Sequence, residues 1–189
     1  MSVSGCFVGA SGAILAHSAG PRMVEEAVSV GVPLRRGDFG RAEGALEGAI
    51  GQRLDTPGRS LRASLRGSYQ GQPLGWRGPG FRAGWLLGAS LDLLWIDDYR
   101  AQVSETIHLG GSLYAPTGEN RGFGFSFEGF VGAAQTPTTS GDPSPTLPDG
   151  VVGGAILRAW YDIHAPDSGS GSSSHGAGLL GRANVPRRR

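Results

Sequence analysis

One stretch of the chain, from Gly80 to Trp95, alternates between apolar residues and small or polar ones over most of its length. Its odd-numbered positions are all apolar: Phe81, Ala83, Trp85, Leu87, Ala89, Leu91, Leu93 and Trp95. Side chains of a β-strand point alternately to opposite faces, so this pattern predicts a long strand with one apolar face. A helix would spread the same side chains around its circumference, and the glycines between them would weaken it.

The same alternation recurs along the chain and predicts further strands. They cover residues 24–34, 42–54, 61–69, 103–113, 123–133 and 151–161, and residues 6–16 could supply an eighth strand. The range 42–54 also has glycines at every fourth position, as in closely packed helices, but its glycine content favours a strand. Pro33 has no N–H group and predicts an edge or the end of its strand.

Turn and loop signals separate these ranges. Residues 35–38 and 55–58 are predicted turns, 70–80 a loop and 116–122 a hairpin loop. The four prolines within residues 135–150 predict a long exposed loop. We therefore expect an N-terminal segment at 1–20 (a first strand or the remnant of a lipoprotein signal), a β-barrel domain at 24–163, and a disordered Ser/Gly/Arg tail at 164–189.

Composition excludes several classes of protein. The chain has one cysteine among 189 residues, which excludes an internal disulfide framework and a cysteine-rich zinc site. Its net charge of +1 gives no general electrostatic argument for nucleic-acid binding. The four histidines lie in separate segments without the spacing of metal ligands, and no cofactor motif is present. We therefore expect no metal, no cofactor and no nucleic-acid partner.

The predicted architecture is an all-β, antiparallel up-and-down meander of seven or eight strands that closes into a small barrel. In a soluble barrel of the lipocalin kind, the apolar face points inward and the outer face is rich in charge. Here the face opposite the apolar one is mostly glycine and serine with few charges. In a membrane barrel the apolar face meets lipid and the small or polar face fills the lumen. The alternation of the strands is compatible with both a soluble barrel and a membrane barrel.

Over residues 24–163 the pattern resembles small bacterial outer-membrane β-barrel proteins. Tyr69, Trp85, Trp95, Trp160 and Tyr161 suit their interfacial aromatic girdles. At the N-terminus, Val3-Ser4-Gly5-Cys6 resembles the lipobox of bacterial lipoproteins, in which the cysteine is lipidated. These resemblances imply a place in the bacterial cell envelope, in the outer membrane or the periplasm, with membrane lipid as a partner and Cys6 as the lipidation candidate.

Charged residues on the small-residue faces are predicted to form ion pairs inside the lumen, because an unpaired buried charge is very costly. These candidates are Arg62, Arg66, Arg82, Asp92, Glu128 and Arg158. If the apolar faces pointed inward instead, aromatic residues would line a pocket for a small apolar ligand. The candidates for that pocket are Phe81, Trp85, Phe123, Phe125 and Phe127.

The sequence thus predicts a non-enzymatic cell-envelope barrel, membrane-inserted or lipid-anchored, with a structural or interaction role. The alternative is a soluble or anchored barrel that binds an apolar ligand in its interior. A third hypothesis is an enzyme with Asp97, Asp98, Glu105 or Glu128 as acid and base, since such catalysis needs two carboxylates near one reacting atom. Outward Trp85 and Phe125 side chains would indicate the membrane barrel, and inward ones the pocket.

Overall fold

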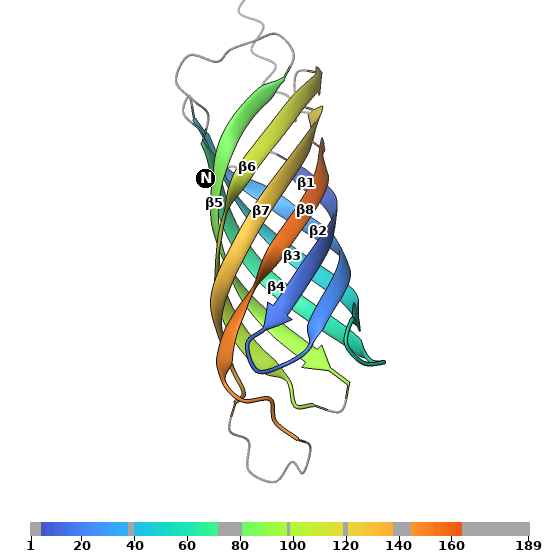
Figure 1. The fold of residues 1–189 in the computed structure, drawn as a ribbon. Coiled ribbons are helices and arrows are strands. Elements are labelled where there is room, and N and C mark those ends of the chain that lie inside the picture. Colours follow the sequence, from blue (N-terminus) through green and yellow to red (C-terminus); the bar gives the residue numbers. More distant parts are fainter. Residues whose placement is uncertain are drawn as a thin grey trace, which may run out of the picture.

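Eight antiparallel strands form a closed barrel in which each strand pairs with its sequence neighbours and β1 also pairs with β8 (Figure 1). The computed structural model describes residues 5–37, 40–71, 81–97, 99–118, 121–137 and 145–163. The strands are β1 (Cys6–His17), β2 (Arg22–Gly37), β3 (Gly40–Arg53), β4 (Arg59–Gly71), β5 (Arg82–Ile96), β6 (Gln102–Gly118), β7 (Arg121–Gln135) and β8 (Gly150–Ile163). The predicted meander barrel is confirmed, and residues 6–17 supply its eighth strand.

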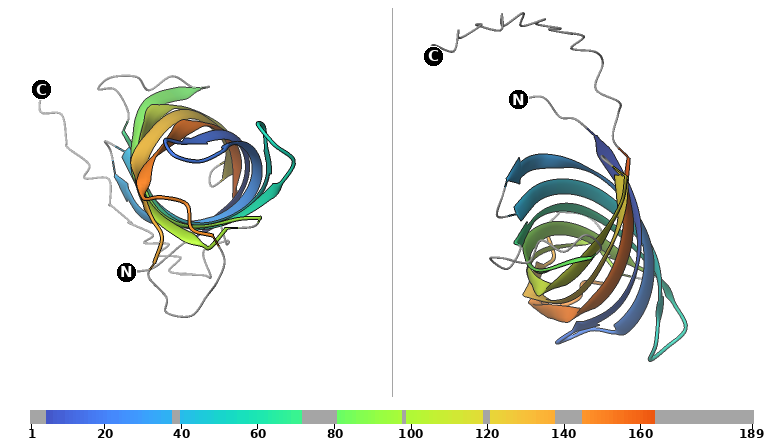
Figure 2. Two further views of the ribbon diagram at one scale, coloured as in Figure 1. Left: turned by 60° about the horizontal axis from the view of Figure 1, so that its bottom comes forward. Right: turned by 90° about the horizontal axis from the view of Figure 1, so that it is seen from above.

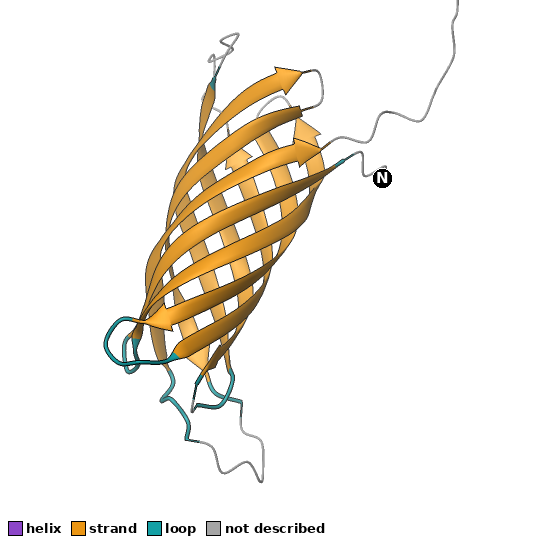
Figure 3. Ribbon diagram, turned by 90° about the vertical axis from the view of Figure 1, so that its right-hand side faces the viewer, coloured by secondary structure: helices purple, strands orange, loops and turns teal. Residues whose placement is uncertain are grey.

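The ring closes without a gap when seen along the barrel (Figure 2, left), and the strands cross the barrel wall at a steep tilt (Figure 3). A sheet can close into a barrel only if its strands tilt relative to the axis. Closure also pairs the first strand with the last, from Cys6 opposite Ile163 to His17 opposite Val152. We call the end where β1 begins the Cys6 end, and the end where β1 finishes the His17 end.

Apolar side chains point outward and polar ones inward, which inverts the arrangement of a soluble protein. On β2, for example, the Val28 side chain is 70% exposed, whereas Glu25 is 1% exposed. Buried apolar side chains form two clusters, Phe7, Ala45 and Trp160 toward the Cys6 end and Leu15, Met23, Leu94, Ile96 and Leu147 toward the His17 end. The lumen between these clusters is polar.

The ambiguous range 42–54 is strand, because β3 pairs along its length with β2 and β4. Pro33 lies within β2, but the pairs with β1 run only as far as Gly31, and the register with β3 shifts after Pro33. Pro33 has no backbone N–H group, but it lies beyond the last residue of β2 that pairs with β1. No hydrogen bond between β1 and β2 is therefore lost. Around Pro33, β2 pairs with β3 alone, as the predicted edge position implies. Elsewhere β2 has a neighbouring strand on each side.

Several predicted turns are shorter than expected. Arg35 to Gly37 belong to β2, Gln70 and Gly71 to β4, and Pro116 to Gly118 to β6, which has a register shift after Pro116. These predictions were wrong at their boundaries because strand pairing continued through residues that favour turns. Asp38, residues 72–80 and the predicted tail at 164–189 lie outside the described residues.

The β7–β8 connection folds back over the His17 end rather than being wholly exposed as predicted. Leu147 is buried against Leu15, Met23, Leu94 and Ile96. Its carbonyl oxygen accepts a hydrogen bond of 2.9 Å from the Thr136 hydroxyl. These contacts place the apolar Leu147 side chain across this end of the lumen, where we call it the stopper. The prolines around Leu147 had predicted an exposed loop instead. Residues 138–144 of the connection lie outside the described part of the chain.

Candidate functional site

Three arginines and four carboxylates meet in the middle of the lumen, between the two apolar clusters. We call this set the lumen ion network: Glu25 on β2, Glu47 on β3, Arg62 and Arg66 on β4, Asp92 on β5, Glu128 on β7 and Arg158 on β8. All seven residues are buried. The parity of each strand explains the arrangement, because these residues occupy the inward positions between outward apolar ones.

Arg62 is the hub of the lumen ion network. Its Nε lies 2.7 Å from Glu25 Oε2 and its Nη2 lies 2.9 Å from Glu47 Oε1. Its Nη1 lies 3.3 Å from Asp92 Oδ1. The planar guanidinium presents donors in several fixed directions, which allows one buried cation to serve three carboxylates. The buried Arg62 cation and the buried carboxylates are thus paired with one another. Each of these charges would be costly if it were buried alone.

Arg158 and Arg66 carry the network across the lumen. Arg158 Nη2 lies 2.7 Å from Glu47 Oε2, and Arg158 Nη1 lies 3.7 Å from Glu128 Oε1. Arg66 Nη2 donates to Glu128 Oε2 from another strand. The ion pairs therefore run in an unbroken chain from β2 to β8 and connect strands that are not neighbours in the barrel wall.

A hydroxyl-rich cluster lines the β5–β6 side of the network. Asp92 accepts hydrogen bonds from Ser64 and, at 2.9 Å, from Ser90. His108 Nε2 lies 3.1 Å from the Ser90 hydroxyl, and His108 Nδ1 lies 3.4 Å from Glu128 Oε2. A hydroxyl, an imidazole and a carboxylate thus follow one another in the order used by nucleophilic catalysts.

The cavity beside this hydroxyl–imidazole–carboxylate arrangement is small. It is lined by His108, Arg62 and Asp92 among others, and has a volume of about 10 Å³. A single water molecule needs about that much space. The contacts of the arrangement link β4, β5, β6 and β7 across the lumen.

Five of the six predicted ion-pair residues lie in the lumen ion network, and Arg82 does not. Arg82 is exposed at the Cys6 end, where it lines a separate polar cavity. Sequence reasoning also missed Glu25, Glu47 and His108. Strand parity predicts an inward position for all three, because each lies on the face opposite the apolar residues. For Glu47 this inference was weaker, because residues 42–54 also showed a helix-like spacing of glycines.

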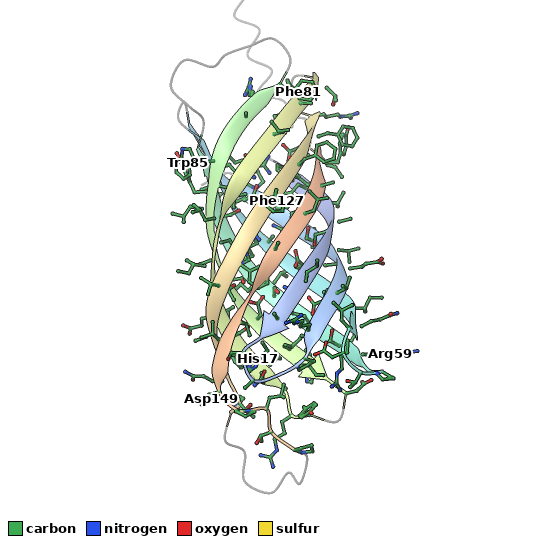
Figure 4. All side chains as sticks on the ribbon, in the orientation of Figure 1. His17, Arg59, Phe81, Trp85, Phe127 and Asp149 are labelled. Carbon is green, nitrogen blue, oxygen red and sulfur yellow. The ribbon has the colours of Figure 1, made fainter. Side chains whose placement is uncertain are left out.

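The aromatic residues predicted to line an interior pocket all point outward. Trp85 is 47% exposed and Phe125 is 49% exposed, and Phe81, Phe123 and Phe127 are exposed as well. Figure 4 shows Phe81 and Trp85 on the outside of the barrel near its Cys6 end. The prediction of an apolar interior pocket is therefore wrong, since the alternation places these rings on the outer face.

Most outward aromatic residues lie on the Cys6 half of the barrel, Phe127 lies near the middle, and Trp95 lies near the His17 end. Tyr69 and Trp85 pack with ring centroids 5.4 Å apart, and Phe123 and Tyr161 with centroids 4.7 Å apart, on the Cys6 half. Trp95 is outward near the His17 end. Such positions match the aromatic girdles of membrane barrels. Trp160 is an exception to the prediction, because its ring is buried inside the lumen against Phe7.

The three described carboxylates of the enzyme hypothesis are not brought together. Asp97 follows β5 and accepts a 2.9 Å hydrogen bond from the Arg59 amide. Glu105 points outward on β6, whereas Glu128 points into the lumen on β7. Asp98 lies outside the described residues. Across the residues that the structure describes, no three His, Cys, Asp or Glu side chains are grouped to hold a metal ion.

Cys6 is the first residue of β1, is half-buried, and lies opposite Ile163 of β8. It forms no disulfide with the residues that the structure describes. Lipidation of Cys6 stays a prediction. In the part of the chain with described coordinates, no helix is both long and apolar enough to cross a membrane.

A closed barrel of eight strands, with a mainly apolar outer surface and a lumen filled by paired charges, has the fold of the small outer-membrane β-barrels of the bacterial cell envelope. The crystal structure of Neisserial surface protein A has this fold: it matches with a TM-score of 0.57 at 13% identity, over 87% of this chain and 98% of that one.

Two further crystal structures are more distant. The outer membrane enzyme PagL matches with a TM-score of 0.48 at 14% identity, over 83% of this chain and 99% of that chain. The N-terminal β-barrel domain of Pseudomonas aeruginosa OprF matches with a TM-score of 0.41 at 18% identity, over 83% of this chain and 97% of that one. No protein-family model and no curated protein sequence matches the chain.

Proposed function

We propose that this protein spans the bacterial outer membrane as a small non-catalytic β-barrel, with a structural or interaction role carried by its two ends. The observation that carries the proposal is the inverted distribution of side chains: an apolar outer surface over a lumen filled with paired charges. In water, such a surface would leave large valine, leucine and aromatic side chains unburied around the whole barrel. In a membrane, the same apolar side chains contact the hydrocarbon chains of the lipid instead of water.

The strand lengths support a membrane span. A tilted β-strand needs about 9–11 residues to cross the hydrocarbon core. The strands here range from 12 residues in β1 to 17 residues in β6. Each is therefore long enough to cross and to extend beyond the hydrocarbon core.

The filled lumen supports a role other than transport. Arg62, Arg158 and Glu47 join strands across the middle of the barrel, and Leu147 covers the His17 end. Eight-stranded barrels are just wide enough for their own side chains. We therefore expect no steady ion current when the protein is inserted into a planar lipid bilayer, and a steady current would contradict this part of the proposal.

The membrane proposal is tested by tryptophan quenching. Single-tryptophan variants that keep Trp85, Trp95 or Trp160, with the other tryptophans replaced by Phe, are reconstituted into vesicles whose acyl chains carry bromine. Outward Trp85 and Trp95 should be quenched, whereas Trp160 inside the lumen should not. Protein that stays monodisperse in water without detergent, with unquenched Trp85 and Trp95, would overturn the proposal.

The lipid-anchor part of the prediction needs its own measurement. Mass spectrometry of the mature N-terminus, after expression from the natural gene with its upstream region, will show whether Cys6 carries acyl chains. An acylated Cys6 would add an anchor to the barrel, and a protein with an unmodified Cys6 would be held by its strands alone.

A further inference from the structure

A polar cavity opens at the Cys6 end of the barrel, apart from the lumen ion network. Its volume is about 130 Å³, and its polar lining consists of Arg41, Gln70, Arg82, Ser112, Tyr114 and Asp162. We call it the mouth cavity. The Arg41 guanidinium lies 5.3 Å from the ring centroid of Phe7, a member of the apolar cluster toward this end of the lumen. The mouth cavity has room for several water molecules or one small ion.

Two hydrogen-bond donors in the mouth cavity are buried without a partner among the described residues. They are Nη2 of Arg41 and Nε2 of Gln70, and Gln70 as a whole is only 9% exposed. Arg41 Nη1 donates to Asp162 Oδ2 at 2.5 Å, and Arg41 Nε forms an ion pair with Glu43 Oε2 at 3.1 Å without the geometry of a hydrogen bond. Buried donors with no acceptor cost free energy, so the mouth cavity favours a ligand that supplies acceptors.

The remaining lining adds donors rather than acceptors. Arg82 is exposed at the rim with its guanidinium donors, and Ser112 contributes a hydroxyl. Asp162 is the one carboxylate of the polar lining, and it already accepts from Arg41 and, at 3.0 Å, from the Tyr114 hydroxyl. The two arginines balance the formal charges of Asp162 and Glu43, and the hydrogen bonds from Arg41 and Tyr114 both end on Asp162 Oδ2. The donors that a ligand can meet are the two buried ones, Arg41 Nη2 and Gln70 Nε2, together with the exposed guanidinium of Arg82.

We propose that the mouth cavity binds a small oxyanion of the phosphate type, held by Arg41 Nη2, Gln70 Nε2 and the Arg82 guanidinium. Phosphate oxygens only accept hydrogen bonds, and arginine donates to them in a fork that matches their spacing. A neutral sugar, whose hydroxyls also donate, fits this donor-rich lining less well. The phosphate group can come from free inorganic phosphate or from a phospholipid headgroup, since the mouth cavity lies at the Cys6 end of the barrel rather than in its middle.

The test uses the full-length protein folded in an uncharged detergent and phosphate-free buffer. Calorimetric titrations are run with inorganic phosphate in one arm and with dihexanoyl phosphatidate in the other. Saturable binding at one site is expected in at least one arm, and the arm that binds identifies the source of the phosphate. Arg82→Gln and Gln70→Glu should each weaken binding about tenfold or more, because each removes a charge-assisted or buried donor.

Arg59→Gln is the matched control, because Arg59 is an exposed arginine at the other end of the barrel (Figure 4). This variant should bind phosphate as the unaltered protein does. Circular dichroism checks that each variant keeps its β-structure, and Arg82→Gln changes only an exposed side chain. Absence of binding in both arms, binding that both mouth variants retain, or saturable binding of methyl glucoside without phosphate binding would overturn the proposal.

Discussion

Arg158 on β8 reaches Glu47 on β3, with 2.7 Å between Nη2 and Oε2, although β1 and β2 separate these strands in the barrel wall. The carboxylate of Glu47 holds Arg62 with its other oxygen, at 2.9 Å. One carboxylate thus ties three strands together through the lumen. This relationship makes the polar interior, rather than an apolar core, the main set of long-range side-chain contacts in the middle of the barrel.

Replacement of the hub of the lumen ion network should be strongly destabilising. In an Arg62→Met variant, Glu25, Glu47 and Asp92 lose their shared cation while they stay buried. We expect the free energy of unfolding to fall by about 3–5 kcal/mol, as when one partner of a buried pair is removed. Urea unfolding in detergent or vesicles measures the change. Arg82→Met at the exposed mouth is the control, expected within about 0.5 kcal/mol; equal losses in both variants would contradict the network.

The Arg66–Glu128 pair should behave as a coupled unit. Arg66→Met or Glu128→Leu alone leaves a buried charge without its closest partner, and each should cost about 3–5 kcal/mol. The double variant removes both charges and should cost clearly less than the sum of the two. A double-mutant cycle by urea unfolding gives the coupling energy. Additive losses would show that the two side chains do not interact in the folded barrel.

The stopper at the His17 end can be tested with a pair of leucine truncations. Leu147→Ala removes a buried side chain that packs on Leu15, Met23 and Leu94, and should cost about 2–5 kcal/mol. Leu54→Ala, in an exposed bend at the same end, should change the free energy of unfolding by no more than about 0.5 kcal/mol. If Leu147→Ala proved as mild as the control, the connection would not seal the lumen.

Charge on the outer surface should be tolerated according to depth in the membrane. Leu65 points outward at the middle of β4, so Leu65→Arg places a cation at the centre of the apolar surface and should cost about 2–4 kcal/mol in vesicles. Gln52→Arg, outward near the His17 end of β3, should cost about 0–1 kcal/mol. The two variants are compared by unfolding in the same lipid. Equal costs would argue against a spanning barrel.

How much of the barrel the sequence predicts can be judged from particular elements. Alternation along 80–95 and in the other ranges identified the strands and the two faces of each, since the period of two is local and needs no partner. The same parity placed Arg62, Arg66, Asp92, Glu128 and Arg158 on the inward faces. Strand ends were predicted less well, as at Arg35 and Pro116, because pairing with a neighbour extends a strand beyond its own signals.

Other features depended on contacts between residues far apart in the chain. The sequence could not show that Leu147 folds back into the barrel end, because its burial depends on side chains from β1, β2 and β5. Strand parity treated Arg82 and Arg66 alike, since both occupy inward positions of adjacent strands. They differ in depth because Arg82 is the first residue of β5, whereas Arg66 lies in the middle of β4 opposite Ser90.

By itself the sequence determined the all-β class, the division of each strand into an apolar and a polar face, and the need for the inward charges to find partners. Tertiary structure alone decided which face met the lumen and which arginine met which carboxylate. Closing the sheet sets the stagger of the strands, and that stagger brings Glu47 within reach of both Arg62 and Arg158. The alternation of apolar and polar residues carries no information on that stagger. A strand shifted by two residues along its neighbour keeps the same side chains on each face.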